Sequence, residues 1–129
     1  MKHAAALNQY RQVDVQTGVV DASPHKIISM LLGGLSDKLA IAKGAILRKD
    51  IATQGEQISR AIRIVDTLRA SLDHNRGGDV AANLYSLYDY MERRLTEANM
   101  NADATIVSEV AVLVEEVASG WDSIPPAHR

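Results

Sequence analysis

Apolar side chains recur at steps of three and four along most of the chain, which is the spacing that places them on one face of an α-helix. The clearest stretch is residues 83–99, NLYSLYDYMERRLTEAN. Its apolar stripe consists of Leu84, Leu87, Met91, Leu95 and Ala98. Tyrosines beside the stripe make the apolar surface wider than a single packing seam needs. A helix with so broad an apolar arc must bury it against its own chain or against a partner.

A second helix is predicted upstream, beginning at Ser23-Pro24 and running to about Arg48. Serine accepts hydrogen bonds from the free N–H groups of a helix start, and proline fits the first helical position. Gly33-Gly34 interrupts this helix at a cost of about 1 kcal/mol per glycine relative to alanine. The simplest explanation is a close helix crossing at which only a backbone fits.

The next predicted helix begins at Asp50 or at Thr53, since either side chain suits a helix cap. The sequence NRGG at 75–78 is predicted to end it, because glycine readily adopts the left-handed conformation of a helix end. Asp79 would then cap the helix of residues 83–99. A polar break at 99–103, with Asn101 or Asp103 as the cap, precedes a last helix that ends near Trp121.

These segments predict an all-α protein, an antiparallel four-helix bundle with a short N-terminal arm or helix. The expected organisation is an arm over residues 1–22, a helical bundle domain over 23–121 and a flexible tail over 122–129. The composition agrees, since 47% of the 129 residues are apolar but only 4% are aromatic, which suits close helix packing.

The net charge and the residue composition argue against several classes of function. The net charge of −2 gives no electrostatic reason to expect a nucleic acid or an acidic membrane as partner. No apolar run is long enough for a membrane span or a signal peptide, and the absence of cysteine is compatible with a reducing cytosol. A cytoplasmic protein is therefore expected.

No catalytic, cofactor or metal site is predicted. The four histidines are scattered between a terminus, a helix start, a turn and the tail, and the Glu-x-x-His pair of di-iron bundles does not occur. Neither glycine pair is followed by the Lys-Ser/Thr of a phosphate loop. A triad assembled in space is not testable from the sequence, but the pattern as a whole argues against an enzyme.

The excess of apolar surface points instead to a protein partner. Every predicted helix carries more than one apolar stripe, whereas a helix of a small bundle hides only one arc. Amphipathic helices commonly dock into exposed apolar grooves. A helix-binding bundle and a self-associating scaffold both satisfy this pattern, and so does a bundle that binds a regulatory protein.

The segment of residues 83–99 resembles the flagellar secretion chaperones that bind flagellin. The matching residues there are Leu84, Leu87, Tyr88, Asp89, Tyr90, Met91, Arg94, Leu95, Ala98 and Asn99. The preceding helix matches the same family at Ile58, Ala61, Ile64, Val65, Leu68, Leu72 and Asp73. Tyr10, Gly34 and Trp121 also match, whereas Leu32 and Gly33 depart from the family pattern.

The resemblance implies a cytosolic export chaperone. It would bind the disordered C-terminal helical segment of flagellin one-to-one, prevent premature polymerisation and assist flagellar type III secretion, with the export gate as a further partner. Without its ligand the protein could dimerise through the same apolar faces. The predicted contacts are Tyr10, Leu31, Leu35, Ile51, Ile58, Leu84, Leu87, Tyr88 and Met91.

Overall fold

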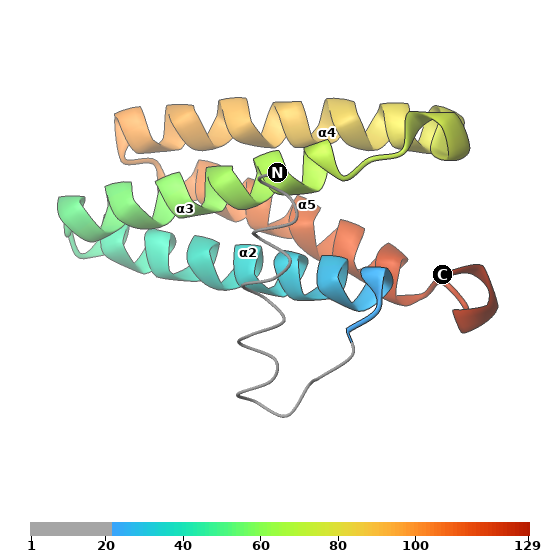
Figure 1. Ribbon diagram of the computed structural model, residues 1–129. Coiled ribbons are helices and arrows are strands. Elements are labelled where there is room, and N and C mark those ends of the chain that lie inside the picture. Colours follow the sequence, from blue (N-terminus) through green and yellow to red (C-terminus); the bar gives the residue numbers. More distant parts are fainter. Residues whose placement is uncertain (1–21) are drawn as a thin grey trace.

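The computed structural model describes residues 22–129, which form four long helices and one short terminal turn. The helices are α2 (Pro24–Leu47), α3 (Ile51–Ala70), α4 (His74–Asn101) and α5 (Ala104–Asp122), and the turn is the 3-10 helix η1 (Pro126–His128). Successive helices run in opposite directions, α3 and α5 both pack on α2, and α4 packs on α3 and α5 (Figure 1). The prediction of an all-α antiparallel four-helix bundle is confirmed. The arm predicted for residues 1–22 lies outside the described residues, apart from Ala22.

Short polar side chains begin each long helix. The Ser23 hydroxyl accepts a hydrogen bond from the Lys26 N–H at 3.1 Å, as its position before a proline predicts. Of the alternatives left open by the sequence, Asp50 caps α3 and Asp103 caps α5. Each carboxylate accepts from backbone N–H groups of the first turn, which would otherwise have no partner within the helix.

The turn between α3 and α4 differs from the prediction. The last residue of α3 is Ala70, and Asp73 rather than Asp79 caps α4 by accepting from two backbone N–H groups at 3.1 Å. The glycine pair does not end α3 but lies inside α4, where Gly78 has φ 50° and ψ −125°. Only glycine adopts that conformation without strain. The first turn of α4 is therefore kinked away from the rest of the helix.

The Gly33-Gly34 pair does not mark a close helix crossing. A Cβ atom added at Gly33 would meet nothing within 4 Å, and one at Gly34 would lie 3.9 Å from Ile64 Cδ1. Both positions have room for a methyl group, so the explanation offered by the sequence is wrong.

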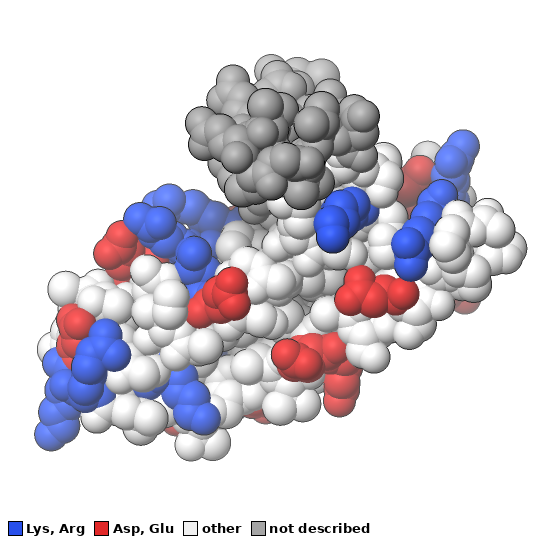
Figure 2. Space-filling view, turned by 90° about the horizontal axis from the view of Figure 1, so that it is seen from below, with Lys and Arg blue, Asp and Glu red and all other residues white. Residues whose placement is uncertain are grey.

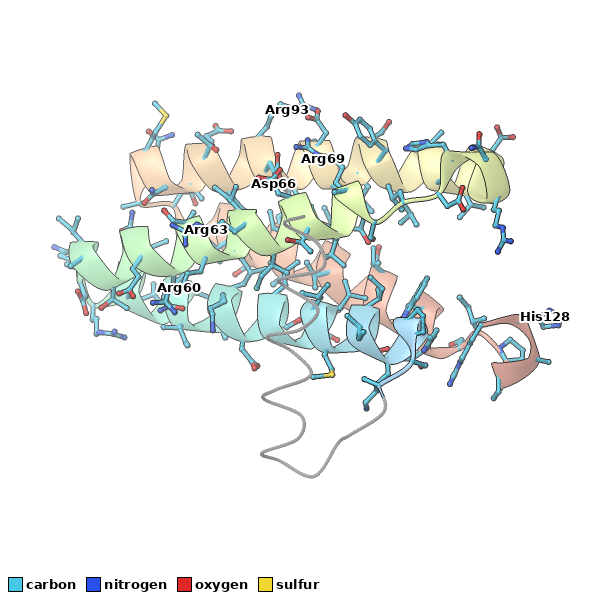
Figure 3. All side chains as sticks on the ribbon, viewed as in Figure 1. Arg60, Arg63, Asp66, Arg69, Arg93 and His128 are labelled. Carbon is cyan, nitrogen blue, oxygen red and sulfur yellow. The ribbon has the colours of Figure 1, made fainter. Side chains whose placement is uncertain are left out.

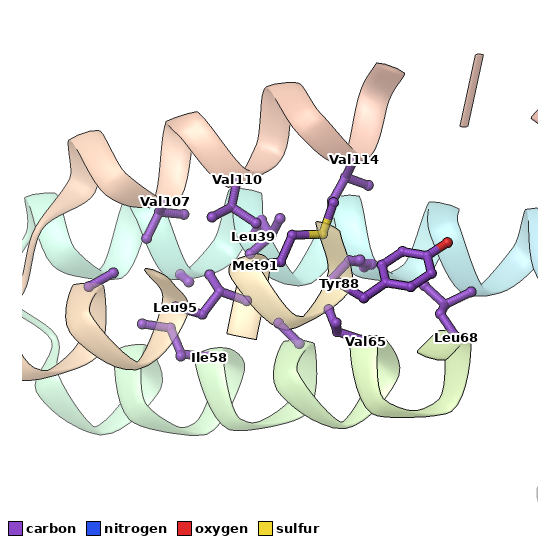
Figure 4. Close-up of a cluster of buried hydrophobic side chains, with 14 of the residues drawn as sticks. Leu39, Ile58, Val65, Leu68, Tyr88, Met91, Leu95, Val107, Val110 and Val114 are labelled. Atoms are coloured by element: carbon purple, nitrogen blue, oxygen red, sulfur yellow. The ribbon is translucent and has the colours of Figure 1, made fainter. Parts of the chain in front are cut away.

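The core lies along the axis of the bundle and draws on all four helices (Figure 4). Its side chains are aliphatic apart from one tyrosine and one methionine, which allows the helices to pack closely. The largest fully buried side chains are Leu32, Leu35, Leu39, Ile58, Val65, Leu68, Met91, Leu95, Val107, Val110 and Val114.

A polar and aromatic clasp joins the end of α5 to the start of α2. The Trp121 indole N–H donates to the His25 carbonyl oxygen at 3.0 Å, and His25 Nε2 lies 2.8 Å from the Trp121 carbonyl oxygen. The two rings stack at 4.7 Å between centroids. The tail after this clasp, predicted to be flexible, contains η1, and Arg129 donates hydrogen bonds to the Asp122 and Ile124 carbonyl oxygens.

Candidate apolar binding surface

The structure divides the predicted contact residues into two groups. Five of them have exposed fractions between 0% and 4% and contribute to the core, namely Leu31, Leu35, Ile58, Tyr88 and Met91. A partner cannot touch these side chains in this structure. Sequence periodicity identifies an apolar arc, but a four-helix bundle needs a broad arc on each helix because each helix packs against two neighbours.

Three predicted contact residues remain accessible, and Tyr10 lies outside the described residues. Ile51 is 76% exposed at the first residue of α3, whereas Leu84 and Leu87 are half-buried on α4. They lie at opposite ends of the bundle. Gln54, one turn after Ile51, donates hydrogen bonds to Asn99 at the far end of α4, which lies about 22 Å from Leu84 at 1.5 Å per residue.

Leu84 and Leu87 belong to an apolar strip between α4 and α5. Arg94 and Tyr90 of α4 both contact Glu109 of α5, at 2.8 Å and 3.2 Å respectively, which fixes the antiparallel register of the two helices. Beyond these contacts α5 diverges from α4 towards the start of α2, and its Val117 packs against the edge of the core, as Leu84 of α4 does (Figure 1).

Leu113 follows Glu109 by one turn on the same face of α5, and Leu87 precedes Tyr90 by about one turn on the same face of α4. All four side chains of this strip are half-buried and pack against the edge of the core. We call Leu84, Leu87, Leu113 and Val117 the α4–α5 strip. The sequence shows Leu113 and Val117 as part of an apolar helix face, but only the structure assigns them to the strip.

The direction of α5 accounts for this partial exposure. Figure 1 shows α5 beginning near the C-terminal end of α4 and ending near the start of α2. The Glu109 contacts hold its first half to α4, and the His25–Trp121 clasp holds its end to α2. The N-terminal half of α4 is therefore less completely covered than its C-terminal half.

A second apolar surface lies at the end of the bundle where α2 turns into α3. Leu47, Ile51 and Met100 are 68%, 76% and 80% exposed, which are high values for large apolar side chains. The Gln54–Asn99 hydrogen bonds bring the turns that carry Ile51 and Met100 together. We call these three residues the end patch.

Charged side chains of both signs lie on the molecular surface. Figure 2 shows lysines, arginines, aspartates and glutamates interspersed over one face of the molecule. At the α4–α5 contact, the hydrogen bond from Arg94 lowers the pKa of Glu109, so this carboxylate is ionised at neutral pH. Mixed charge favours an apolar partner surface over a strongly charged polymer.

The described part of the chain lacks clustered metal ligands and membrane-spanning helices. Among residues 22–129, no group of three or more His, Cys, Asp or Glu side chains could hold a metal ion. None of the helices described here is long and apolar enough to cross a membrane.

Comparison with known proteins identifies the family. The family model for the flagellar protein FliS matches residues 6–128. The flagellar secretion chaperone FliSB of Pseudomonas aeruginosa is 46% identical over 119 residues, which cover 92% of this chain and 94% of the relative. The flagellar secretion chaperone FliS of Salmonella typhimurium is 42% identical over 127 residues, with 98% and 94% coverage. That of Bacillus subtilis is 31% identical over 114 residues, with 88% and 84% coverage. The chain therefore belongs to the FliS family of flagellar secretion chaperones.

Proposed function

We propose that this chain is a cytoplasmic export chaperone that binds the disordered C-terminal helical segment of flagellin, one molecule to one. Binding would keep flagellin from polymerising before it reaches the flagellar type III export gate. The proposal rests on membership of the family and on the resemblance in residues 83–99, and the accessible apolar strip on the same helix is the structural observation that supports it.

The separation of the two apolar surfaces favours an extended ligand. The α4–α5 strip and the end patch lie near opposite ends of a bundle, about 20 Å or more apart at the rise of an α-helix. A compact ligand touches only one of them. A segment that is disordered before binding can wrap around the bundle and cover both.

The same physical argument explains why such a complex can be released. Burying the apolar face of each ligand helix removes that face from filament contacts. Ordering the ligand costs about 2–5 kcal/mol or more of the gross interaction energy, so a large interface need not bind irreversibly. These are useful properties for a chaperone that must give up its cargo.

Flagellin polymerisation measured by light scattering tests the proposal. The wild-type protein at equimolar concentration should suppress polymerisation. Leu87→Ala in the α4–α5 strip should weaken suppression several-fold, because it removes an accessible apolar contact. Val112→Ala is the matched control, since Val112 is 56% exposed and lies outside both apolar surfaces.

Two outcomes separate the binding site from the function. If Leu87→Ala and Val112→Ala both suppress polymerisation like the wild type, the α4–α5 strip is not the binding surface. If the wild-type protein has no effect on polymerisation, the proposed function itself is wrong.

A self-associating scaffold is the second candidate, favoured by the exposure of Leu47, Ile51 and Met100. Large apolar side chains in a cluster often mark an interface between copies of a chain. Light scattering of the protein alone, over a range of concentrations, distinguishes this scaffold from the chaperone, which should form a one-to-one complex when flagellin is added.

A further inference from the structure

A cluster of charged side chains crosses the contact between α3 and α4. Arg69 of α3 lies at its centre, 2.7 Å from Asp66, 3.5 Å from Asp89 and 3.2 Å from Glu92. Arg93 on α4 approaches Asp89 at 3.1 Å. Figure 3 shows Asp66 and Arg69 between α3 and α4, with Arg93 on the side of α4 that faces away from α3. These five residues are the α3–α4 charge cluster.

The charges of this cluster do not balance. Three carboxylates face two guanidinium groups, so the cluster carries a net charge of −1 when all five groups are ionised. No charged side chain of α2 or α5 in the described residues forms an ion pair with it. A single bound proton would make the cluster neutral.

Glu92 is the carboxylate least suited to carry the excess charge. Its side chain is only 17% exposed, and its Oε1 atom is buried without a hydrogen-bond partner among residues 22–129. A buried acceptor with no partner is costly, and a buried charge more so. Protonation removes the charge and turns the Glu92 carboxyl group into a donor, for which the Asp66 carboxylate is a suitable acceptor.

The surroundings of Glu92 act in the same direction. The pKa of Glu92 is raised to about 7, chiefly by burial. The neighbouring carboxylates of Asp66 and Asp89 act in the same direction, and the positive charge of Arg69 opposes them. The geometry and the electrostatics therefore both indicate that Glu92 binds a proton near neutral pH and removes the excess negative charge.

We propose that the α3–α4 contact is a proton-sensitive junction, in which one proton shared between Glu92 and Asp66 strengthens the packing of α3 on α4 and its loss weakens it. The inference concerns the folded chain alone and does not depend on the ligand. It makes the bundle most stable on the acidic side of neutrality.

The direction of the pH effect follows from linkage. The folded protein holds this proton up to about pH 7, whereas an unfolded glutamate releases it near pH 4.5. The stabilisation is complete below about pH 4.5 and is lost as the pH rises towards 7. Within that window the unfolding constant should increase up to tenfold per pH unit from this group, and above pH 7 the effect should level off.

Urea denaturation of the full chain between pH 5 and 8 tests the proposal. Glu92→Gln supplies a neutral side chain of the same shape, so it should be more stable than the wild type at pH 8 and should lack the wild-type decline. Glu97→Gln is the control, since Glu97 is an exposed glutamate of the same helix that pairs with Arg94. This control should follow the wild-type profile.

Parallel pH profiles for the wild type and Glu92→Gln would overturn the proposal. NMR titration of the Glu92 side-chain carboxyl carbon in the wild-type protein measures the titration midpoint directly and does not depend on the folding of any variant. A midpoint near pH 7 supports the junction, and a midpoint near 4.5 refutes it.

Discussion

Replacing Leu95 and Leu87 by alanine, one at a time, tests separately the two roles of the apolar stripe on α4, which are core packing and partner binding. Leu95 is fully buried among core residues, whereas Leu87 is half-buried in the α4–α5 strip. Leu95→Ala removes apolar contacts and leaves a cavity, which should lower the free energy of unfolding by about 2–5 kcal/mol. For a domain of this size the melting temperature should fall by roughly 10–20 °C.

Leu87→Ala should destabilise the fold less than Leu95→Ala does, but it should weaken flagellin binding more. Full burial of a leucine side chain contributes about 1.5–3 kcal/mol, so a half-buried one should contribute roughly half of that. A bound helix would bury the remaining surface, and the same truncation should therefore weaken flagellin binding by about tenfold, or roughly 1.4 kcal/mol.

Urea denaturation followed by circular dichroism measures the stability of both variants, and calorimetric titration measures their binding. The expected pattern is a large stability loss with near-normal affinity for Leu95→Ala, compared at a temperature where the variant is folded. The opposite pattern is expected for Leu87→Ala. Equal losses of stability in the two variants would refute the assignment of Leu95 to the core and Leu87 to the surface.

Four further substitutions test local features of the fold. Gly33→Ala should stabilise the bundle by about 0.5–1 kcal/mol because open space surrounds the position. Gly78→Ala should destabilise it by about 1–3 kcal/mol because Gly78 has φ 50°. Urea denaturation midpoints measure both effects, and a gain in stability for Gly78→Ala would contradict the kink. Trp121→Phe deprives the His25 carbonyl of its indole donor and should cost about 1–3 kcal/mol in thermal unfolding. Asp103→Ala removes the α5 cap and should cost about 1 kcal/mol by the same measurement, and an unchanged melting temperature would mean that solvent replaces the cap.

Local chemistry made the helix starts predictable. Ser23 before a proline and Asp103 in a polar break have side chains whose preferred partners are backbone N–H groups of the next turn. The prediction that NRGG at 75–78 ends the preceding helix was wrong, because α3 ends at Ala70, Asp73 rather than Asp79 caps α4, and Gly78 forms a kink inside α4. A sequence of several turn-forming residues predicts that the chain bends, but tertiary packing selects the residue at which it does so.

The division between core and surface was not predictable from periodicity. Leu87 and Met91 are one turn apart on the same stripe, yet Met91 is fully buried and Leu87 is only half-buried. The difference arises from the course of α5, which leaves α4 for α2 after the Glu109 contacts. That course depends on contacts between residues far apart in sequence, such as Trp121 with His25, and no local pattern specifies them.

The partial burial of Glu92 in the α3–α4 charge cluster was also not predictable from the sequence. Asp89 and Glu92 lie about one turn apart, which is typical of a solvated helix face beside an arginine. The structure instead turns Glu92 towards α3, where Asp66 and Arg69 surround it. Partial burial of a charged residue depends on the packing of a neighbouring helix, and the α4 sequence alone contains no sign of it.

Calorimetric titration of the protein with the isolated C-terminal segment of flagellin from its own organism tests the central claim most directly. The proposed function predicts saturation near one-to-one and a clearly negative heat-capacity change, because an apolar segment folds as it is buried. The absence of heat at several temperatures, with no shift in the sedimentation of either component, would contradict flagellin binding.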